Sequence, residues 1–277
     1  MASVKDLLRE AHDLPGESPR VDAEILLCHT LDKPRSWLYT WPEAVPTDPE
    51  LERYTWLLQQ RREGQPIAYL TGSREFWSLN LAVNEHTLIP RPETEMLVEW
   101  ALQLSLADNA LVLDLGTGSG AVALALASER SGWNIMAIDV SESALAVAET
   151  NRRALGFDNV SCRHSDWFGA LQDLQFDLLV SNPPYVEVGD AHVGEGDLRF
   201  EPAGALLSGG DGLDDIRQLI KAAPGHMKPG AGLLLEHGYQ QGQKVREILS
   251  LAGYSGVVTR RDVQGHERVT GGFYCAD

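Results

Sequence analysis

The sequence predicts an α/β protein in which a small N-terminal helical bundle is joined by a β-hairpin linker to a larger domain with one central sheet. Three observations support this prediction. Apolar residues recur at helical spacing as far as residue 73, alternate with other residues over 74–89, and from residue 90 onward form short strands separated by helices. The order of these later segments predicts a Rossmann-like sheet of seven strands with one reversed strand.

The N-terminal part, residues 1–73, is expected to be a separate domain. At 277 residues the chain exceeds the length of an average domain. Prolines punctuate this part, as expected for the joints between short helices. Its apolar residues fall into three groups at helical spacing: Val4, Leu7, Leu8 and Ala11; Ala23, Ile25, Leu26 and Leu27; and Leu51, Tyr54, Leu57 and Leu58. These side chains are expected to form the core of the bundle.

Residues 74–89 are predicted to be the hairpin linker, because their apolar residues are spaced as in paired strands: Phe76, Trp77, Leu79, Leu81 and Val83. The linker leads into Pro90-Arg91-Pro92, after which residues 93–106 are predicted to form a helix. This junction is a candidate cover for a ligand pocket. Alternatively, it is a rigid joint in which Arg91 pairs with a nearby acid.

A glycine-rich turn follows the first predicted strand of the larger domain, residues 90–277. The strand spans 111–115, the turn is Gly116-Thr117-Gly118-Ser119-Gly120, and a helix over 121–129 follows. Glycines permit positive φ and let backbone N–H groups at the helix start approach a ligand. A second strand, 134–139, ends at Asp139, about 20 residues after the glycines, where a ribose-binding carboxylate is expected. Together these elements predict an adenosine-type ligand.

The charge beside the turn distinguishes two classes of adenosine ligand. Asp114 lies just before the glycines, where a carboxylate repels a pyrophosphate but attracts the ammonium or sulfonium group of S-adenosylmethionine. The spacing is Gly-x-Gly-x-Gly, whereas dinucleotide enzymes carry Gly-x-Gly-x-x-Gly. The sequence therefore favours S-adenosylmethionine, and a dinucleotide such as NAD is the alternative.

Residues 181–185, Ser-Asn-Pro-Pro-Tyr, follow the apolar run 176–180 and therefore lie where a buried strand ends. Two successive prolines remove two backbone donors and fix φ, so the turn is stiff. The Asn182 amide and the Pro183 carbonyl can together accept both hydrogens of a planar NH2 group, while the ring of Tyr185 covers its face. The turn is a candidate recognition site for an amide or an exocyclic amine; alternatively, it only ends a strand.

The remaining segments alternate between helices and strands. A short strand over 160–163 is followed by Asp166-Trp167-Phe168. Helices are expected over 143–155, 213–223 and 243–252, a buried strand over 232–236, and a terminal antiparallel pair over 257–261 and 272–274. These segments complete the predicted sheet.

Several motifs together resemble known families. Asp-Leu-Gly-Thr-Gly-Ser-Gly at 114–120, the strand end at Asp139 and Asn-Pro-Pro-Tyr at 182–185 resemble a class I amino-methyltransferase. Leu-Ile-Pro-Arg-Pro-Glu-Thr-Glu at 88–95 and Arg-Glu-Phe-Trp at 74–77 narrow the resemblance to the HemK-type release factor glutamine methyltransferases. It covers nearly the whole chain, including Arg-Phe-Glu-Pro at 199–202. The implied fold is that of a class I S-adenosylmethionine-dependent methyltransferase.

The resemblance implies an activity and a set of site residues. The enzyme would transfer a methyl group from S-adenosylmethionine, leaving S-adenosylhomocysteine, to the side-chain amide nitrogen of the glutamine in the Gly-Gly-Gln motif of class I peptide chain release factors, and so modulate translation termination. The implied catalytic residues are Asn182, Pro183 and Tyr185, and Pro184 joins them in binding substrate. The implied cofactor residues are Asp114, Gly116, Thr117, Gly118, Ser119, Gly120, Asp139, Asp166, Trp167 and Asn182, with Trp167 beside the adenine and Asp166 at its exocyclic amine.

Charge and composition restrict the possible partners. Residues 1–80 carry 9 basic and 13 acidic side chains, a net charge of −4, so the rest carries −13 of the total −17. Nucleic-acid binding needs clustered Lys and Arg, so no direct nucleic-acid contact is expected. The three cysteines have no Cys-x-x-Cys spacing and the histidines are scattered, so neither a disulfide framework nor a metal site is predicted. No membrane span or leader is apparent, and a cytoplasmic monomer is expected.

Two alternatives to the protein methyltransferase stay open. A nucleic-acid adenine amino-methyltransferase shares Asn-Pro-Pro-Tyr, but it should present a basic face. A non-enzymatic sensor of an adenosyl ligand would need the glycine turn but not Asn182. For the favoured enzyme, residues 1–73 are expected to dock the protein substrate, because a stable protein contact buries about 1,200–2,000 Å², more than one glutamine-bearing loop provides.

Overall fold

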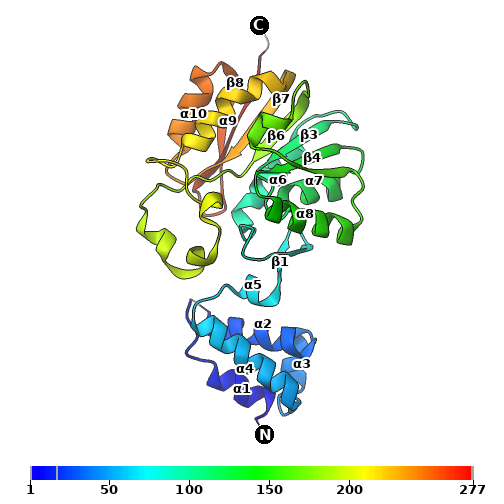
Figure 1. Cartoon of the computed structure of the whole chain (residues 1–277), viewed down its shortest axis with the longest axis vertical. Helices are drawn as coiled ribbons and strands as arrows, with labels where there is room; N and C mark the ends of the chain where they lie inside the picture. The colour runs from blue at the N-terminus through cyan, green and yellow to red at the C-terminus, as the bar shows by residue number, and fades with distance from the viewer. Residues whose placement is uncertain (1, 17, 276–277) are drawn as a thin grey trace. The chain divides into compact units, whose positions relative to one another are not determined.

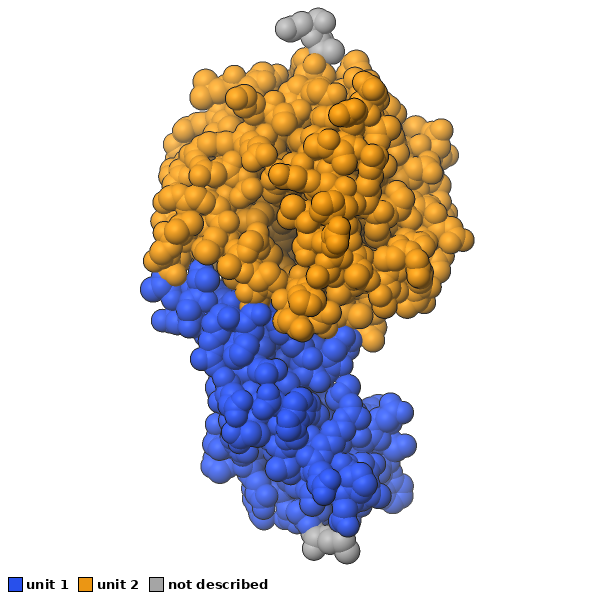
Figure 2. Space-filling view, viewed as in Figure 1, with its two compact units in different colours: residues 1–73, 191–200 blue, residues 74–190, 201–277 orange. Residues whose placement is uncertain are grey.

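A computed structural model of the protein describes residues 2–16 and 18–275. The chain divides into two compact units, coloured in Figure 2: residues 1–73 with 191–200, and residues 74–190 with 201–277. No sequence feature indicated that 191–200 belong with the N-terminal helices rather than with the larger domain. Among the described residues, no helix is long and apolar enough to cross a membrane.

Unit 1 is a small helical bundle with its own apolar core. The core contains residues from all three predicted groups, including Leu7, Leu26 and Leu57. Ser3 begins the first helix with a capping box, in which its side chain and that of Asp6 each accept a backbone N–H. The helices are α1 Val4–Glu10, α2 Pro19–Leu31, α3 Arg35–Thr40, α4 Asp48–Arg62 and α5 Ile67–Thr71, with the 3-10 turns η3 Ala191–Gly194 and η4 Gly196–Phe200.

A buried arginine joins residues 191–200 to the bundle. Arg61 donates to Asp22 and to Asp197, each at 2.9 Å, and its side chain is only 9% exposed. Arg199 also donates to the main-chain carbonyl of Glu63. Because a partly desolvated arginine with two carboxylate partners is costly to disrupt, these contacts explain why this segment packs with unit 1.

The predicted hairpin is present, and it is shorter than the predicted linker. It consists of β1 Ser73–Phe76 and β2 Leu79–Ala82. Trp77 and Ser78 between the strands both have positive φ, 52° and 60°, which is the backbone of a two-residue type I′ turn. The buried side chain of Asn151 bonds to the main-chain N–H and C=O of Ala82 and to the carbonyl of Ser119. This asparagine therefore fixes the hairpin next to the glycine turn.

The central sheet of unit 2 has the predicted seven strands, in the order β5-β4-β3-β6-β7-β9-β8. β9 is the reversed strand, because it pairs antiparallel with both β7 and β8. The strands are β3 Leu111–Leu115, β4 Asn134–Asp139, β5 Val160–His164, β6 Phe176–Ser181, β7 Met227–Glu236, β8 Tyr254–Arg261 and β9 Glu267–Tyr274. The strand order reverses at β3, between β4 and β6, so a ligand crevice is expected at the carboxyl ends of these three strands.

Helices cover both faces of this sheet (Figure 1). Successive strand residues face opposite sides: Val112 packs in the core that includes α6 and α7, and Leu113 in the core that includes α9 and α10. The helices are α6 Glu95–Gln103, α7 Ala121–Glu129, α8 Glu142–Leu155, α9 Asp214–Ala222 and α10 Gly242–Leu251. The helix predicted over 93–106 is shorter, because a 3-10 turn, η1 Pro92–Thr94, precedes α6 and Leu104 is extended. Further 3-10 turns are η2 Trp167–Ala170, η5 Ala203–Ala205 and η6 Ala223–His226.

Candidate active site

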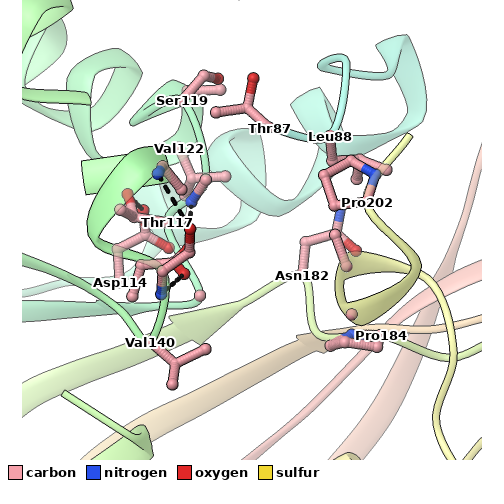
Figure 3. A pocket seen from close by; sticks show the side chains of 18 of the residues that line it. Thr87, Leu88, Asp114, Thr117, Ser119, Val122, Val140, Asn182, Pro184 and Pro202 are labelled. Atoms are coloured by element: carbon pink, nitrogen blue, oxygen red, sulfur yellow. Dashed lines mark hydrogen bonds between the residues drawn. The ribbon is translucent and has the colours of Figure 1, made fainter. Parts of the chain in front are cut away.

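A pocket of about 350 Å³ lies in unit 2 at the carboxyl ends of β3, β4 and β6, within the size range of small-molecule sites. Ten of the thirteen site residues expected from the sequence line it: Asp114, Gly116, Thr117, Gly118, Ser119, Asp139, Asp166, Trp167, Asn182 and Pro184. Figure 3 shows Asp114 and Thr117 on one side of the pocket, with Asn182 and Pro184 on the other. The structure thus brings the glycine turn and the Asn-Pro-Pro-Tyr turn to one cavity.

Sequence reasoning missed other lining residues. Those on the linker and junction are His86, Thr87, Leu88, Pro90 and Thr94; those near the first two strands are Ala121, Val122, Val140, Ser141, Ala144 and Ser165; and those later in the chain are Pro202, Gly204, Ala205 and Asp215. Within the first group, Pro90 belongs to the junction already considered as a cover, and the other four residues lie near it in the sequence. Of the later residues, Pro202 ends the Arg-Phe-Glu-Pro segment, whose match carried no assignment to the site, and the others follow it.

Asp114 is buried at the base of the glycine turn, where it is 1% exposed. The Thr117 hydroxyl donates to its Oδ2 at 2.6 Å, and the Ala123 N–H donates to the same oxygen at 3.2 Å. Burial nevertheless raises the pKa of this carboxyl to about 7, and the charge of Asp139 adds to the rise. A buried acid with this pKa is suited to pair with a cation that enters the pocket.

Asp114→Asn is expected to remove a pH-dependent destabilisation of the ligand-free protein. The folded-state pKa of about 7 exceeds the ordinary value of 3.8, so this group's contribution to stability declines as pH rises from about 4 to about 7. At 1.36 kcal/mol per pH unit, the loss is at most roughly 4 kcal/mol. Urea unfolding of both proteins at about pH 5 and about pH 8 spans about two of these pH units, so roughly 3 kcal/mol of the loss should be seen in the wild type. Equal losses in the variant and the wild type would contradict the prediction.

Asp139 is held by backbone N–H groups on both carboxylate oxygens. Gly118 donates to Oδ2 and Ser141 donates to Oδ1, each at 2.9 Å. A carboxylate oxygen can accept more than one hydrogen bond, so both oxygens can still accept from a ligand. Gly118 has a φ of +57°, and a Cβ built there would meet no atom within 4 Å. The glycine therefore leaves open space beside the carboxylate.

Trp167 forms one wall of the pocket in an uncommon backbone conformation. Its φ is +43°, which is strained for a bulky side chain. Ser165 stabilises this turn, because its hydroxyl donates to the Trp167 carbonyl and accepts from the Ala170 N–H. Backbone strain of this kind clusters at binding sites. A Cβ on Gly116 would lie 3.5 Å from the indole ring, so the glycine turn lies close to this ring.

Gly120, Pro183 and Tyr185 do not line the pocket. Gly120 precedes α7 with a φ of +87°, and a Cβ there would meet Leu124 at 3.0 Å and Ala148 at 3.3 Å. A glycine at this position therefore permits the positive φ and the close packing of these side chains. The Tyr185 hydroxyl donates to Glu236 Oε1 at 3.3 Å, and burial raises the pKa of this tyrosine. That its ring covers a substrate amide stays a prediction.

Asn182 presents an acceptor with no partner. Its Nδ2 donates to Thr94 Oγ1 at 3.2 Å, and its Oδ1 is buried without a hydrogen-bond partner. The preceding residue, Ser181, donates to the Leu115 carbonyl at 2.6 Å, which ties the start of the turn to the end of β3. Unsatisfied buried acceptors are rare in native proteins. This oxygen is therefore suited to accept a hydrogen from a substrate.

The Pro90-Arg91-Pro92 junction is both a cover for the pocket and a joint in which Arg91 pairs with an acid. Pro90 lines the pocket, as expected of a cover. Arg91 does not; it donates to the buried carboxylate of Glu201, which also accepts from the Ile89 N–H at 3.3 Å. Arg91 therefore acts as a joint that holds the junction to the segment beginning at Glu201.

Comparison with known proteins gives matches along the chain. A model of the PrmC N-terminal domain matches residues 2–72, and a model of the methyltransferase small domain matches residues 93–213. The release factor glutamine methyltransferase of Pseudomonas aeruginosa is 51% identical over 270 residues, covering 98% of each chain. That of Escherichia coli is 48% identical over 259 residues, covering 94% of each.

Solved structures with low sequence identity share the fold. A methyltransferase from Pyrococcus furiosus matches with a TM-score of 0.55 at 17% identity, covering 83% of this chain and 100% of that one. The hMettl16 catalytic domain in complex with an RNA, the MAT2A 3'UTR hairpin 6, matches with a TM-score of 0.59 at 16% identity, covering 83% and 84%. At these identities the likeness concerns the fold alone, whereas the full-length relatives establish the family. The chain belongs to the release factor glutamine methyltransferase family.

Proposed function

We propose that this protein transfers the methyl group of S-adenosylmethionine to the side-chain amide nitrogen of the glutamine in the Gly-Gly-Gln motif of class I peptide chain release factors. S-adenosylhomocysteine is the second product. The observation that carries this proposal is that one pocket contains both the glycine turn with its carboxylates and Asn182 with its unpartnered oxygen. A donor site and an amide-recognition site are thereby adjacent, as methyl transfer requires.

The residues present fit the methyl donor. The Asp139 carboxylate is placed to accept from the ribose hydroxyls, Trp167 to pack on the adenine, and Asp166 to accept from its exocyclic amine. Asp114 and Thr117 lie where the methionine ammonium would be attracted. Among the described residues that line the pocket, four are aspartates and none is a lysine or an arginine. This charge favours a cationic ligand over a pyrophosphate.

Orientation of the substrate amide is the main contribution expected of the chain. The amide nitrogen is a weak nucleophile, because its lone pair is delocalised into the carbonyl. In this mechanism Asn182 Oδ1 accepts one amide hydrogen and the Pro183 carbonyl accepts the other, which aligns the nitrogen with the methyl group. Correct positioning supplies roughly 7–11 kcal/mol, whereas general-base catalysis of 10²–10⁴-fold supplies about 3–6 kcal/mol. The proton leaves after transfer, when the nitrogen is cationic and acidic.

Methyl-transfer assays with labelled donor test this proposal against its alternatives. Label is expected in a folded release factor and not in DNA, because residues 81–277 carry a net charge of −13, which disfavours binding to phosphates. Label in DNA alone would support an adenine amino-methyltransferase. Donor binding without label in either substrate would support an adenosyl-ligand sensor.

Unit 1 is proposed to dock the release factor. Its exposed aromatic side chains include two tryptophans, Trp41 and Trp56, each 58% exposed, and aromatic residues are enriched in protein interfaces. Loss of an interface tryptophan typically costs 2 kcal/mol or more, roughly 30-fold in affinity. Trp41→Ala or Trp56→Ala is therefore expected to lower kcat/KM for a folded release factor by about that factor.

A short peptide containing Gly-Gly-Gln is the control substrate, and both tryptophan variants should methylate it as the wild type does. Leu251→Ala is the control variant, because Leu251 is 89% exposed on unit 2. If both tryptophan variants matched Leu251→Ala on the folded release factor, these rings would not belong to the docking surface.

The enzyme is further proposed to act as a monomer in the cytoplasm, where peptide chain release factors work. Sedimentation at micromolar concentration, with and without a release factor, measures its oligomeric state. A stable dimer would contradict the first part of this proposal.

A further inference from the structure

Behind Asn182 lies a buried polar cluster that the mechanism above does not use. It consists of Thr94, Glu236 and the hydroxyl of Tyr185. Glu236 is the last residue of β7, and β7 pairs in parallel with β6 so that Ser181 lies opposite Leu235. Asn182 and Glu236 therefore follow neighbouring positions of adjacent strands. Thr94 reaches the cluster from η1, the 3-10 turn before α6.

Glu236 is a carboxyl group without solvent contact. It is 1% exposed, and its Oε2 has no partner within hydrogen-bonding geometry. Tyr185 donates to Oε1 at 3.3 Å, and the neighbouring hydroxyl of Thr94, as a donor, lowers the pKa of this carboxyl. A buried carboxyl is costly to retain, and nothing in the packing of a strand end requires one.

When Glu236 is ionised, the hydrogen atoms of this cluster have one consistent arrangement. Ionised Glu236 can only accept, so the single hydroxyl hydrogen of Thr94 points to it. The oxygen of Thr94 then accepts from Asn182, and it is the Nδ2 of Asn182 that lies 3.2 Å away. The carboxylate thus determines, through Thr94, which end of the Asn182 amide faces Thr94 and which end is left free.

We infer that Thr94 and Glu236 are positioning residues that fix the orientation of the Asn182 amide, so that Oδ1 rather than Nδ2 is presented to the substrate amide. The inference rests on the proposed function of Asn182 and adds the reason why its side chain has one orientation. An asparagine turned over would place a donor against the substrate NH2 group. Two donors cannot bond to each other, and the amide would not be aligned.

Glu236→Gln tests the acceptor at the end of this series of hydrogen bonds, with almost no change in the shape of the side chain. Tyr185 still donates to the glutamine oxygen, which leaves Nε2 facing Thr94. The Thr94 oxygen then accepts from Gln, and its hydrogen turns toward Asn182 and favours the inverted amide. Since a misplacement of about 1 Å can cost roughly 100-fold in rate, kcat for release factor methylation should fall by about 10- to 100-fold. The Kd for S-adenosylmethionine should stay the same.

Thr94→Val and Thr94→Ser test the hydroxyl that links Glu236 to Asn182. Valine has the shape of threonine without the hydroxyl, so a loss of kcat similar to that of Glu236→Gln is expected. Serine keeps the hydroxyl and should restore kcat to within about threefold of the wild type. Because Glu236 acts on Asn182 through Thr94, the double variant Thr94→Val with Glu236→Gln should be no slower than the slower single variant.

The pH dependence of kcat gives a readout that a purely structural role would not change. Burial raises the pKa of Glu236 to about 7; Thr94, Tyr185 and Arg268 oppose this rise and Glu93 adds to it. Protonated Glu236 can itself donate to Thr94, so kcat measured with saturating S-adenosylmethionine should fall as pH drops below about 7. Saturation removes the effect of Asp114 on donor binding. In Glu236→Gln this fall of kcat at low pH should be absent.

The outcomes separate this inference from the proposed function. If the wild type does not methylate a release factor, the proposed function itself fails. If the wild type is active, the inference is overturned by Thr94→Val or Glu236→Gln with wild-type kcat, by additive losses in the double variant, or by an unchanged fall of kcat at low pH in Glu236→Gln. Thermal unfolding of each variant checks folding, and a variant that binds S-adenosylmethionine with wild-type Kd has an intact donor site.

Discussion

Asn182→Ala is expected to lose roughly 100- to 1,000-fold in kcat/KM for release factor methylation. The substitution removes the acceptor that orients the substrate amide, and loss of one preorganised hydrogen-bonding group at a reacting centre costs about this much. Donor binding should persist, because Asp114, which is assigned to the donor, lies on the other side of the pocket from Asn182 (Figure 3). Single-turnover methylation of a folded release factor and calorimetric titration with S-adenosylmethionine measure the two effects.

Asn109→Ala is the matched control for this prediction, since Asn109 is exposed before β3 and lines no part of the pocket. It should methylate at the wild-type rate. Turnover of Asn182→Ala equal to that of Asn109→Ala would remove Asn182 from catalysis. A large loss of donor affinity in Asn182→Ala would instead assign this side chain chiefly to the donor.

Asp139→Ala is expected to weaken binding of S-adenosylmethionine by roughly 100- to 10,000-fold. The carboxylate would accept two ribose hydroxyl hydrogen bonds, and bonds to a charged group contribute about 1.5–3 kcal/mol each. The alanine variant also leaves the N–H groups of Gly118 and Ser141 without their present acceptor. Calorimetric titration measures the affinity, and circular dichroism shows whether the fold persists.

Two further variants distinguish ligand contact from loop support. Asp139→Asn keeps the size of the side chain and one acceptor oxygen, so its affinity should lie between those of the wild type and Asp139→Ala. Asp158→Ala is the control, because the Asp158 side chain is fully exposed. A folded Asp139→Ala variant with the wild-type Kd would show that the donor does not use this carboxylate.

The sequence predicted the parts of the site that depend on local structure. Strand β3, the turn beginning at Gly116 and the strand end at Asp139 are contiguous segments whose conformation follows from apolar runs and from glycine at positive φ. Gly116, Gly118 and Gly120 indeed have φ of 74°, 57° and 87°. Parallel pairing of β3 with β4 and β6 then brings their ends together. The central sheet could therefore be predicted from periodicity and order alone.

Residues that reach the site through tertiary packing could not be predicted in this way. Thr94 lies in a short 3-10 turn, and Glu236 ends an apolar strand. The local sequence therefore does not mark either residue as part of the site. Pro202 follows a segment whose path depends on the bonds of Arg91 to Glu201 and of Arg61 to Asp197. The same limit applies to Gly120, because only the packed helices show that its missing Cβ makes room for Leu124 and Ala148.

Mass analysis of a release factor detects the proposed methyl transfer itself. An unmethylated class I release factor is incubated with S-adenosylmethionine and either the wild type or Asn182→Ala, then weighed intact and fragmented to locate any added group. We expect the wild type to add one methyl group to the side chain of the Gly-Gly-Gln glutamine. In the same time the variant should add almost none. A release factor that stays unmodified, or that gains its methyl group at another residue, would contradict the account.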